Sequence, residues 1–293
     1  MCKKRNPRIY LSAVFVFVLV FFLFITFTGC LTYKISSSDL EKLKETETQE
    51  ASAEETTIEE KEVSEQSEIE TTAVEEETTT ASSEEKASIQ EGEVTFTTED
   101  EINLNGNIFG AGEKWAVLSH MYPTDQQSWF DFAKYLKQNG FGALTFDFRG
   151  YGKSEGEKDI SKINIDLEAA VNFLKKNGIE RIYLIGASMG GTACLVVAAD
   201  EEVNGVIAIS APMEFKGLDA KDILDSITCP KLFIATEGDG DADEVAQEFY
   251  NKTAEPKAIE ILGGNSHGTF IFEEDPANAE LLKKLIIEFL QKY

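Results

Sequence analysis

Cysteine, histidine, proline and basic residues are all scarce in this chain. Its 293 residues include 4 cysteines, 2 histidines and 6 prolines, and 27 basic against 53 acidic residues give a net charge of −26. The deficit of positive charge argues against nucleic acid as a partner, because binding to phosphates needs basic patches. Only Cys194 and Cys229 lie in the part expected to fold, which is too few for a disulfide framework.

Aromatic residues are absent from residues 39–93, and glycine is absent there before Gly92. The segment holds 20 acidic residues and four lysines, and most of the rest is Thr, Ser and Ala. Such a composition buries too little apolar surface to fold, and charge repulsion keeps it extended. The sequence therefore predicts a disordered acidic linker over residues 31–93.

A long apolar run precedes the linker. Residues 9–27 are apolar except for Tyr10, Ser12 and Thr26, and four basic residues lie within 1–8. This pattern is typical of a signal peptide or of a membrane-spanning helix, and the basic end stays in the cytoplasm in both cases. The sequence therefore predicts a signal peptide or membrane anchor over residues 1–30.

Cys30 follows this run in a Phe-Thr-Gly-Cys segment. The segment resembles the lipobox of bacterial lipoproteins, in which cleavage leaves an N-terminal cysteine that carries the lipid. An uncleaved anchor that merely ends at this cysteine is the alternative. Both interpretations place the C-terminal part at the cell membrane, on its extracytoplasmic face.

From residue 94 to residue 293, apolar runs typical of strands alternate with segments typical of helices. This alternation predicts an α/β domain with a mostly parallel sheet and helices on both faces. Eight strands are expected, over 94–98, 102–109, 115–119, 143–148, 182–186, 206–210, 232–236 and 258–262. Helices are expected over 128–138, 163–176, 189–199, 220–226, 242–251 and 277–291.

Ser188 stands between glycines where the fifth expected strand meets a helix. Residues 186–190 are Gly-Ala-Ser-Met-Gly. Glycine two positions before and after the serine permits a sharp, strained turn that pushes the hydroxyl outward. The turn also places the amide of Met189 at a helix N-terminus, where it can hold a developing oxyanion. A tight turn with an unreactive serine is the alternative.

This segment resembles the GxSxG nucleophile elbow of the α/β-hydrolase family. The order of elements over 94–293 is similar to that family's core, and Asp-Phe-Arg-Gly-Tyr-Gly-Lys-Ser at 147–154 resembles its DxRGxGxS turn. The resemblance implies an α/β-hydrolase fold and a serine hydrolase. Because a short segment joins the sixth and seventh expected strands, no sizeable lid domain is expected, which favours small or surface-presented substrates.

The resemblance implies a catalytic histidine after the last strand and a carboxylate after the seventh. His267 lies in the glycine-rich loop 263–268, at the first of these positions. Asp239 is the expected acid, and Asp241 is the alternative. Asp243 could instead cap the following helix.

The three aspartates also have the spacing of a calcium loop. Such a loop needs a glutamate at its twelfth position, and residue 250 is a tyrosine. No metal and no organic cofactor is implied.

A second oxyanion donor is implied in the loop 118–123, after the third strand. Many relatives have His-Gly there and this chain has His120 and Met121, so the amides of Met121 and Tyr122 are both candidates. His120 is expected to fix this loop rather than act as a second base.

Together these residues predict a membrane-tethered serine hydrolase of the carboxylesterase type. Ser188, activated by His267 and Asp239, would form an acyl-enzyme with an ester substrate. A peptidase or a thioesterase would use the same residues. A non-catalytic binding or scaffold protein of the cell envelope is the alternative from another class.

Overall fold

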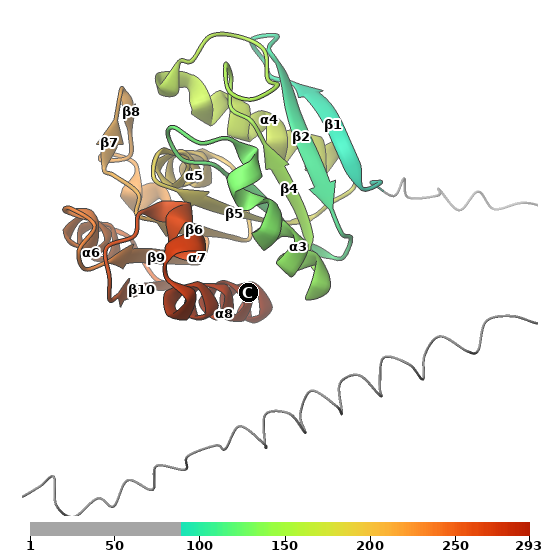
Figure 1. Ribbon diagram of the computed structural model, residues 1–293. Helices are drawn as coiled ribbons and strands as arrows, with labels where there is room; N and C mark the ends of the chain where they lie inside the picture. The colour runs from blue at the N-terminus through green and yellow to red at the C-terminus, as the bar shows by residue number, and fades with distance from the viewer. Residues whose placement is uncertain (1–88) are drawn as a thin grey trace, which may run out of the picture. The chain divides into compact units, whose positions relative to one another are not determined.

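The computed structural model describes residues 89–293, and an eight-stranded sheet runs through them (Figure 1). Its strands are β1 (Gly92–Thr97), β2 (Asn103–Phe109), β3 (Lys114–Ser119), β4 (Gly142–Phe146), β5 (Arg181–Ala187), β6 (Gly205–Ile209), β9 (Lys231–Thr236) and β10 (Lys257–Leu262). They lie side by side in the order β1-β2-β4-β3-β5-β6-β9-β10. β2 is antiparallel to β1 and β4, and all other neighbours are parallel. The predicted mostly parallel sheet of eight strands is confirmed.

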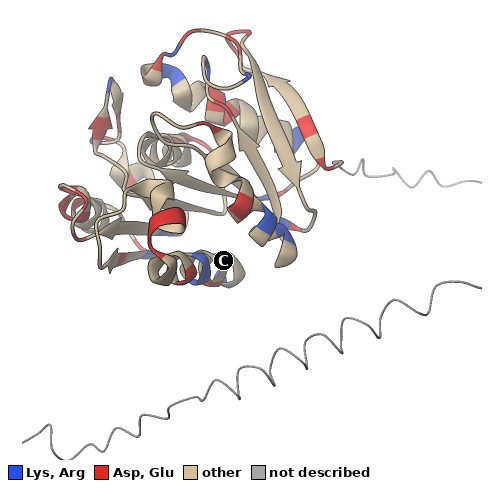
Figure 2. Ribbon diagram, in the orientation of Figure 1, with Lys and Arg blue, Asp and Glu red and all other residues tan. Residues whose placement is uncertain are grey.

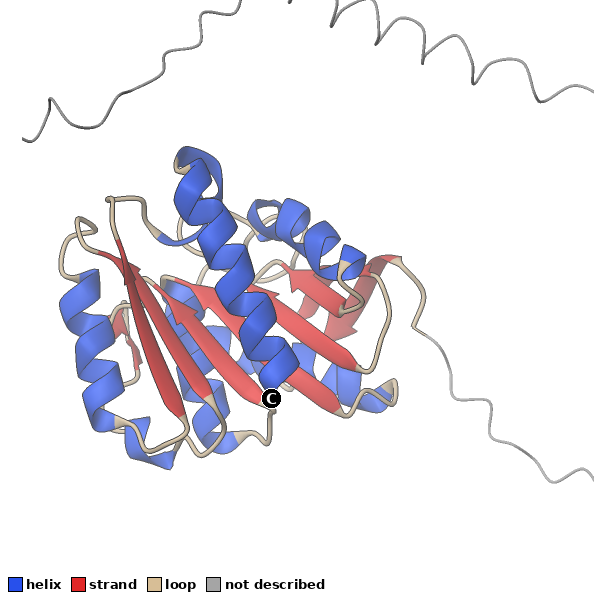
Figure 3. Cartoon of the chain, turned by 90° about the horizontal axis from the view of Figure 1, so that it is seen from below, coloured by secondary structure: helices blue, strands red, loops and turns tan. Residues whose placement is uncertain are grey.

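Helices cover both faces of this sheet (Figure 3). They are α3 (Phe130–Gln138), α4 (Ile163–Lys176), α5 (Met189–Asp200), α6 (Ala242–Lys252), α7 (Ile271–Glu274) and α8 (Pro276–Lys292). Short 3-10 turns are η1 (Gln126–Trp129), η2 (Ile160–Lys162), η3 (Leu224–Ser226) and η4 (Gly268–Phe270). Five of the six expected helices are therefore found close to their expected positions.

The central strand β5 shows how the two layers of helices are packed. Because side chains alternate along a strand, successive residues of β5 face opposite sides of the sheet. Ile182 and Leu184 lie in one apolar cluster with residues of α4, α5 and α6, whereas Tyr183 and Ile185 lie in a second with residues of α3 and α8. Burial on both faces explains why the parallel strands are continuous apolar runs in the sequence.

The segment between β6 and β9 differs from expectation. The prediction of a helix over 220–226 is wrong, because only the 3-10 turn η3 forms there. The amide of Ala220 instead donates to the carbonyl of Met213 (3.0 Å) and closes a small hairpin, β7 (Glu214–Phe215) with β8 (Leu218–Asp219). Since the segment holds only this hairpin and η3, the expected absence of a sizeable lid agrees with the fold of residues 89–293.

The predicted signal peptide or anchor over 1–30, and nearly all of the predicted linker over 31–93, lie outside the described residues. β1 begins at Gly92, two residues before the expected start of the folded region. Within residues 89–293, none of the helices has both the length and the apolar character needed to cross a membrane.

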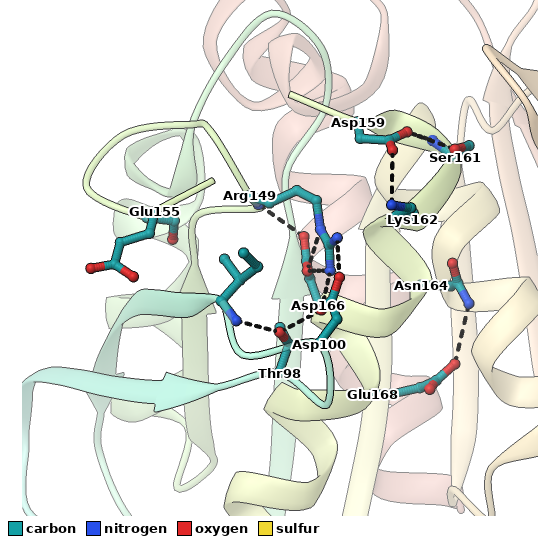
Figure 4. A network of polar contacts seen from close by, with 12 residues as sticks. Thr98, Asp100, Arg149, Glu155, Asp159, Ser161, Lys162, Asn164, Asp166 and Glu168 are labelled. Carbon is teal, nitrogen blue, oxygen red and sulfur yellow. Dashed lines mark hydrogen bonds and ion pairs between the residues drawn. The ribbon is translucent and has the colours of Figure 1, made fainter. Parts of the chain in front are cut away.

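A buried ion network fixes the turn that follows β4 (Figure 4). The side chain of Arg149 is 4% exposed, and its guanidinium donates to Asp166 on α4 (2.8 Å) and to Asp100 in the β1–β2 turn (2.7 Å). Hydrogen bonds from Arg149 and Thr98 lower the pKa of Asp100 to about 2. Arg149 thus joins the β1–β2 turn, the loop after β4 and α4, so the DxRGxGxS turn contributes to the fold.

Arg149→Met is expected to lower the free energy of unfolding by about 3 kcal/mol, because it leaves the fully buried carboxylate of Asp166 without its partner. Urea denaturation measures the change. Asp100→Asn is the milder control, since the side chain of Asp100 is 37% exposed. Equal losses in the two variants would contradict a special role for the buried pair.

Candidate active site

Ser188 joins β5 to α5 in a conformation that side chains other than glycine rarely adopt, with φ 50° and ψ −122°. The amide of Ser188 donates to the carbonyl of Ile209 (2.8 Å), and its own carbonyl accepts from the amide of Gly191 (2.8 Å). The residue is 7% exposed. The strand, the strained turn and the helix expected around Ser188 are all present.

The glycines on either side of Ser188 are required by close backbone approach. A Cβ on Gly186 would run into the carbonyl of Gly190. A Cβ on Gly190 would lie 2.6 Å from the carbonyl oxygen of His120, and closer still to that of Ser119. The turn that carries Ser188 is therefore packed directly against the loop after β3.

His267 contacts one of the two candidate carboxylates. Its Nδ1 lies 2.7 Å from Oδ2 and 2.9 Å from Oδ1 of Asp239. The Asp239 side chain is 14% exposed and that of His267 is 38% exposed. Asp241, the alternative acid, stands at the start of α6 and makes no side-chain capping hydrogen bond there. With Nδ1 donating to Asp239, Nε2 of His267 is the nitrogen left to accept a proton.

The loops that carry Asp239 and His267 are tied to each other. The amide of Gly238 donates to the carbonyl of Gly264 (2.8 Å), and the hydroxyl of Thr236 donates to the carbonyl of Ser266 (3.1 Å). Because β9 and β10 are parallel neighbours, these loops leave the same edge of the sheet. These hydrogen bonds therefore hold the two loops so that the side chains of His267 and Asp239 are in contact.

The residue after His267 reaches the residue before Ser188. A Cβ on Gly268 would lie 3.2 Å from Cβ of Ala187, so the loop of His267 lies beside the turn that carries Ser188. Within residues 89–293, Ser188 Oγ takes part in none of the hydrogen bonds found. Contacts between a nucleophile and its base are often long in the absence of substrate. The fold nevertheless brings all three side chains to one edge of the sheet.

Ser210, which was not among the residues predicted for this site, contacts the loop of His267. It follows β6 with φ 48° and is 2% exposed, and its hydroxyl accepts from the amide of Gly268 (3.2 Å). Its position directly after a buried strand, at the edge where Ser188 also lies, is the signal that would have indicated it.

Three backbone amides near Ser188 donate no hydrogen bond among residues 89–293, namely those of Met189, Met121 and Tyr122. The first amides of a helix have no partner within it, and Met189 is the first residue of α5. The amides of Met189, Met121 and Tyr122 are therefore the candidates to hold an oxyanion beside Ser188. Met121 is fully buried and Tyr122 is 43% exposed, and both amides stay candidates for the second donor.

His120 is buried and holds the loop after β3 in place. Its Nε2 accepts from the amide of Phe148 (3.2 Å), which leaves Nδ1 to donate to the carbonyl of Met121 (3.0 Å). Burial lowers the pKa of His120 to about 4, so the ring is neutral at pH 7. Both nitrogens are occupied, which agrees with a structural role and not with a second base.

The buried ring of His120 predicts a loss of stability in acid. Its pKa falls from an ordinary 6.5 to about 4 on folding, so below pH 6.5 the unfolded chain binds the proton more readily. The free energy of unfolding is therefore unaffected by His120 above pH 6.5. Below that pH it declines toward pH 4, by about 2 kcal/mol between pH 7 and pH 4.5. Urea denaturation at both pH values is expected to show a smaller decline for His120→Gln than for the wild type. Equal declines would rule this contribution out.

A family model described as the alpha/beta hydrolase fold matches residues 117–234. The uncharacterized protein YfhR of Escherichia coli O157:H7 is 22% identical over 175 residues, which are 52% of this chain and 62% of that protein. Bifunctional epoxide hydrolase 2 of Rattus norvegicus is 32% identical over 100 residues, which are 33% of this chain and 18% of that protein. The chain thus spans less than two thirds of the length of either relative.

Solved structures resemble the chain over most of its folded part. The alpha/beta hydrolase GrgF from Penicillium sp. sh18 has a TM-score of 0.61 at 20% identity, covering 70% of this chain and 99% of that one. The esterase Pf2001 of Pyrococcus furiosus has a TM-score of 0.62 at 22% identity, covering 74% and 95%. The predicted fold is confirmed: the chain has the α/β-hydrolase fold.

Proposed function

We propose that the chain is a serine hydrolase that cleaves carboxylic esters, with Ser188 as nucleophile, His267 as general base and Asp239 as the carboxylate that orients it. The observation that carries the proposal is the 2.7 Å contact between His267 and Asp239, at the edge of the sheet where Ser188 is held at φ 50°. A serine hydroxyl needs such a base, because it is a weak nucleophile at neutral pH.

In the first half of the reaction, Nε2 of His267 takes the proton of Ser188 Oγ, and the oxygen attacks the ester carbonyl. The resulting oxyanion accepts hydrogen bonds from the amide of Met189 and from that of Met121 or Tyr122. The imidazolium, stabilised by Asp239, then protonates the departing alcohol. An acyl-enzyme on Ser188 remains.

In the second half, His267 deprotonates a water molecule, which attacks the acyl-enzyme. The tetrahedral intermediate collapses, Ser188 Oγ recovers its proton from His267, and the carboxylic acid leaves. The same steps would serve a thioester or an amide, because the three side chains determine the reaction type and not the leaving group.

Turnover of 4-nitrophenyl butyrate tests the proposal. The wild type is expected to hydrolyse this ester, and Ser188→Ala is expected to retain only a small fraction of kcat. A wild type that hydrolyses no ester, thioester or anilide of the same acyl group would favour the scaffold alternative. Because no lid domain lies between β6 and β9, acetate or butyrate esters are expected to be better substrates than long-chain esters.

We further propose that a lipid on Cys30, which becomes N-terminal when the preceding residues are cleaved off, tethers this hydrolase to a membrane outside the cytoplasm. Incorporation of radioactive palmitate in a bacterial host tests this. Cys30→Ser is expected to abolish incorporation, and Cys2→Ser, the matched control, is expected to retain it, because Cys2 would be removed with the signal peptide. A wild type without label that retains residues 1–30 would favour the uncleaved anchor.

A further inference from the structure

The β7–β8 hairpin places a lysine over the loop that follows β3. The hairpin turn consists of Lys216 and Gly217, with φ of 50° and 90°, as a tight two-residue turn requires. Lys216 Nζ lies 4.2 Å from the centre of the Tyr122 ring and 5.3 Å from that of Phe215. The two ring centres are 6.0 Å apart. An ammonium group is thus held beside the residue whose amide is a candidate oxyanion donor.

Lys216 has no carboxylate partner among residues 89–293. The hairpin carries two acidic residues, but Glu214 accepts from the amide of Gly217 and Asp219 from the amide of Lys221. Figure 2 shows the basic tip of this hairpin next to acidic segments. Residues 89–293 contain 35 acidic and 18 basic residues, so the charge of Lys216 lies in surroundings that otherwise repel anions.

A second lysine lies over a second tyrosine near the same loop. Lys158 Nζ is 4.2 Å from the centre of the Tyr151 ring, and that ring is centred 4.9 Å from the ring of His120. Lys158 also takes part in none of the ion pairs found in residues 89–293. Two ammonium groups from different segments therefore lie over aromatic rings that belong to, or contact, the loop that packs against Gly190.

We infer that Lys216 and Lys158, held over the rings of Tyr122 and Tyr151, form a subsite for a carboxylate carried by the ester substrate. The inference rests on the proposed function, because it names the substrate class of that site. Contact with aromatic rings limits the motion of both ammonium groups, so less entropy is lost when they bind a carboxylate. The rest of the acidic surface would not retain such a substrate, which makes this edge of the sheet its preferred place.

Matched esters test the inference. The acyl chains of 4-nitrophenyl butyrate and 4-nitrophenyl hemisuccinate are equally long and differ by a terminal methyl or carboxylate, and 3-carboxy-4-nitrophenyl butyrate carries the carboxylate on the alcohol half. We expect Lys216→Met to lower the kcat/KM of at least one anionic ester, relative to butyrate, about tenfold. Lys216→Glu is expected to lower the ratio further. Lys221→Met, which removes a nearby lysine without a ring contact, is expected to leave the ratio unchanged.

A purely structural hairpin would lower kcat/KM for all three esters alike, and an unchanged ratio in Lys216→Met would overturn the inference while the proposed function stands. If the wild type hydrolyses none of the esters, the proposed function fails and the subsite is tested by binding alone. Succinate, observed by ligand-detected NMR, is then expected to bind the wild type at least fivefold more tightly than Lys216→Glu. Equal binding would overturn the inference.

Discussion

Replacing Asp239 by Asn is expected to lower kcat for ester hydrolysis about 10⁴-fold while KM changes little. The carboxylate of Asp239 accepts a hydrogen bond from Nδ1 of His267 at 2.7 Å. An amide in its place can donate to Nδ1, which favours the tautomer with the proton on Nε2. That nitrogen can then no longer accept the proton of Ser188. The loss is therefore expected in the chemical step, in kcat.

Asp241→Asn is the matched control for this substitution. Asp241 lies two residues along the same loop and makes no side-chain capping hydrogen bond at the start of α6, so kcat is expected to stay within about twofold of the wild type. Steady-state kinetics with 4-nitrophenyl butyrate separate the two variants. Equal losses, or a loss only in Asp241→Asn, would show that the contact between His267 and Asp239 does not orient the base.

Gly190→Ala is expected to destabilise the chain by more than about 3 kcal/mol and to abolish ester hydrolysis. The added methyl would meet the backbone carbonyls of Ser119 and His120, neither of which can turn away as a side chain could. Relief requires the turn at Ser188 to move away from the loop after β3. That movement separates the nucleophile from the amides of Met121 and Tyr122.

Gly263→Ala is the control, because a Cβ at this position would have no atom within 4 Å. We expect its free energy of unfolding and its kcat to stay close to those of the wild type. Urea denaturation and ester turnover of the same preparations give both quantities. A Gly190→Ala chain with wild-type stability and turnover would mean that the close approach of the two backbones is not needed.

The strands could be predicted because the sheet is covered on both faces. β5 and β6 are buried at nearly every position, so each is a continuous apolar run ending in a turn. The helix α4 was expected at its observed bounds, Ile163–Lys176, because its buried positions recur at helical spacing and Asn177 and Gly178 follow it.

Shorter elements could not be predicted in this way. β7 and β8 have two residues each, which is too few for a periodic pattern to appear. The helical propensity of residues 220–226 was misleading, because the hydrogen bond from Ala220 to Met213 commits the start of that segment to the hairpin. η4 and α7, which follow His267, were not predicted because they too are short for a periodic pattern to appear.

The candidate site was predictable where it depends on the ends of strands. Ser188, Asp239 and His267 follow β5, β9 and β10, and parallel strands bring their carboxyl ends to one edge. Asp239 was expected and is the acid that contacts His267, whereas the pairing of Gly238 with Gly264, which ties the two loops together, follows no local pattern in the sequence. Lys216 and Tyr122 are far apart in the chain, so the contact between them follows only from the folded structure.

Activation of Ser188 by His267 is tested most directly by locating the adduct of a fluorophosphonate, which reacts with activated serines. After digestion, mass spectrometry is expected to find the phosphonyl group on the peptide that contains Ser188 in the wild type, and to find almost none in His267→Ala. An unmodified Ser188 in folded wild-type chain, under conditions that fully label a known serine esterase, would contradict its role as the nucleophile.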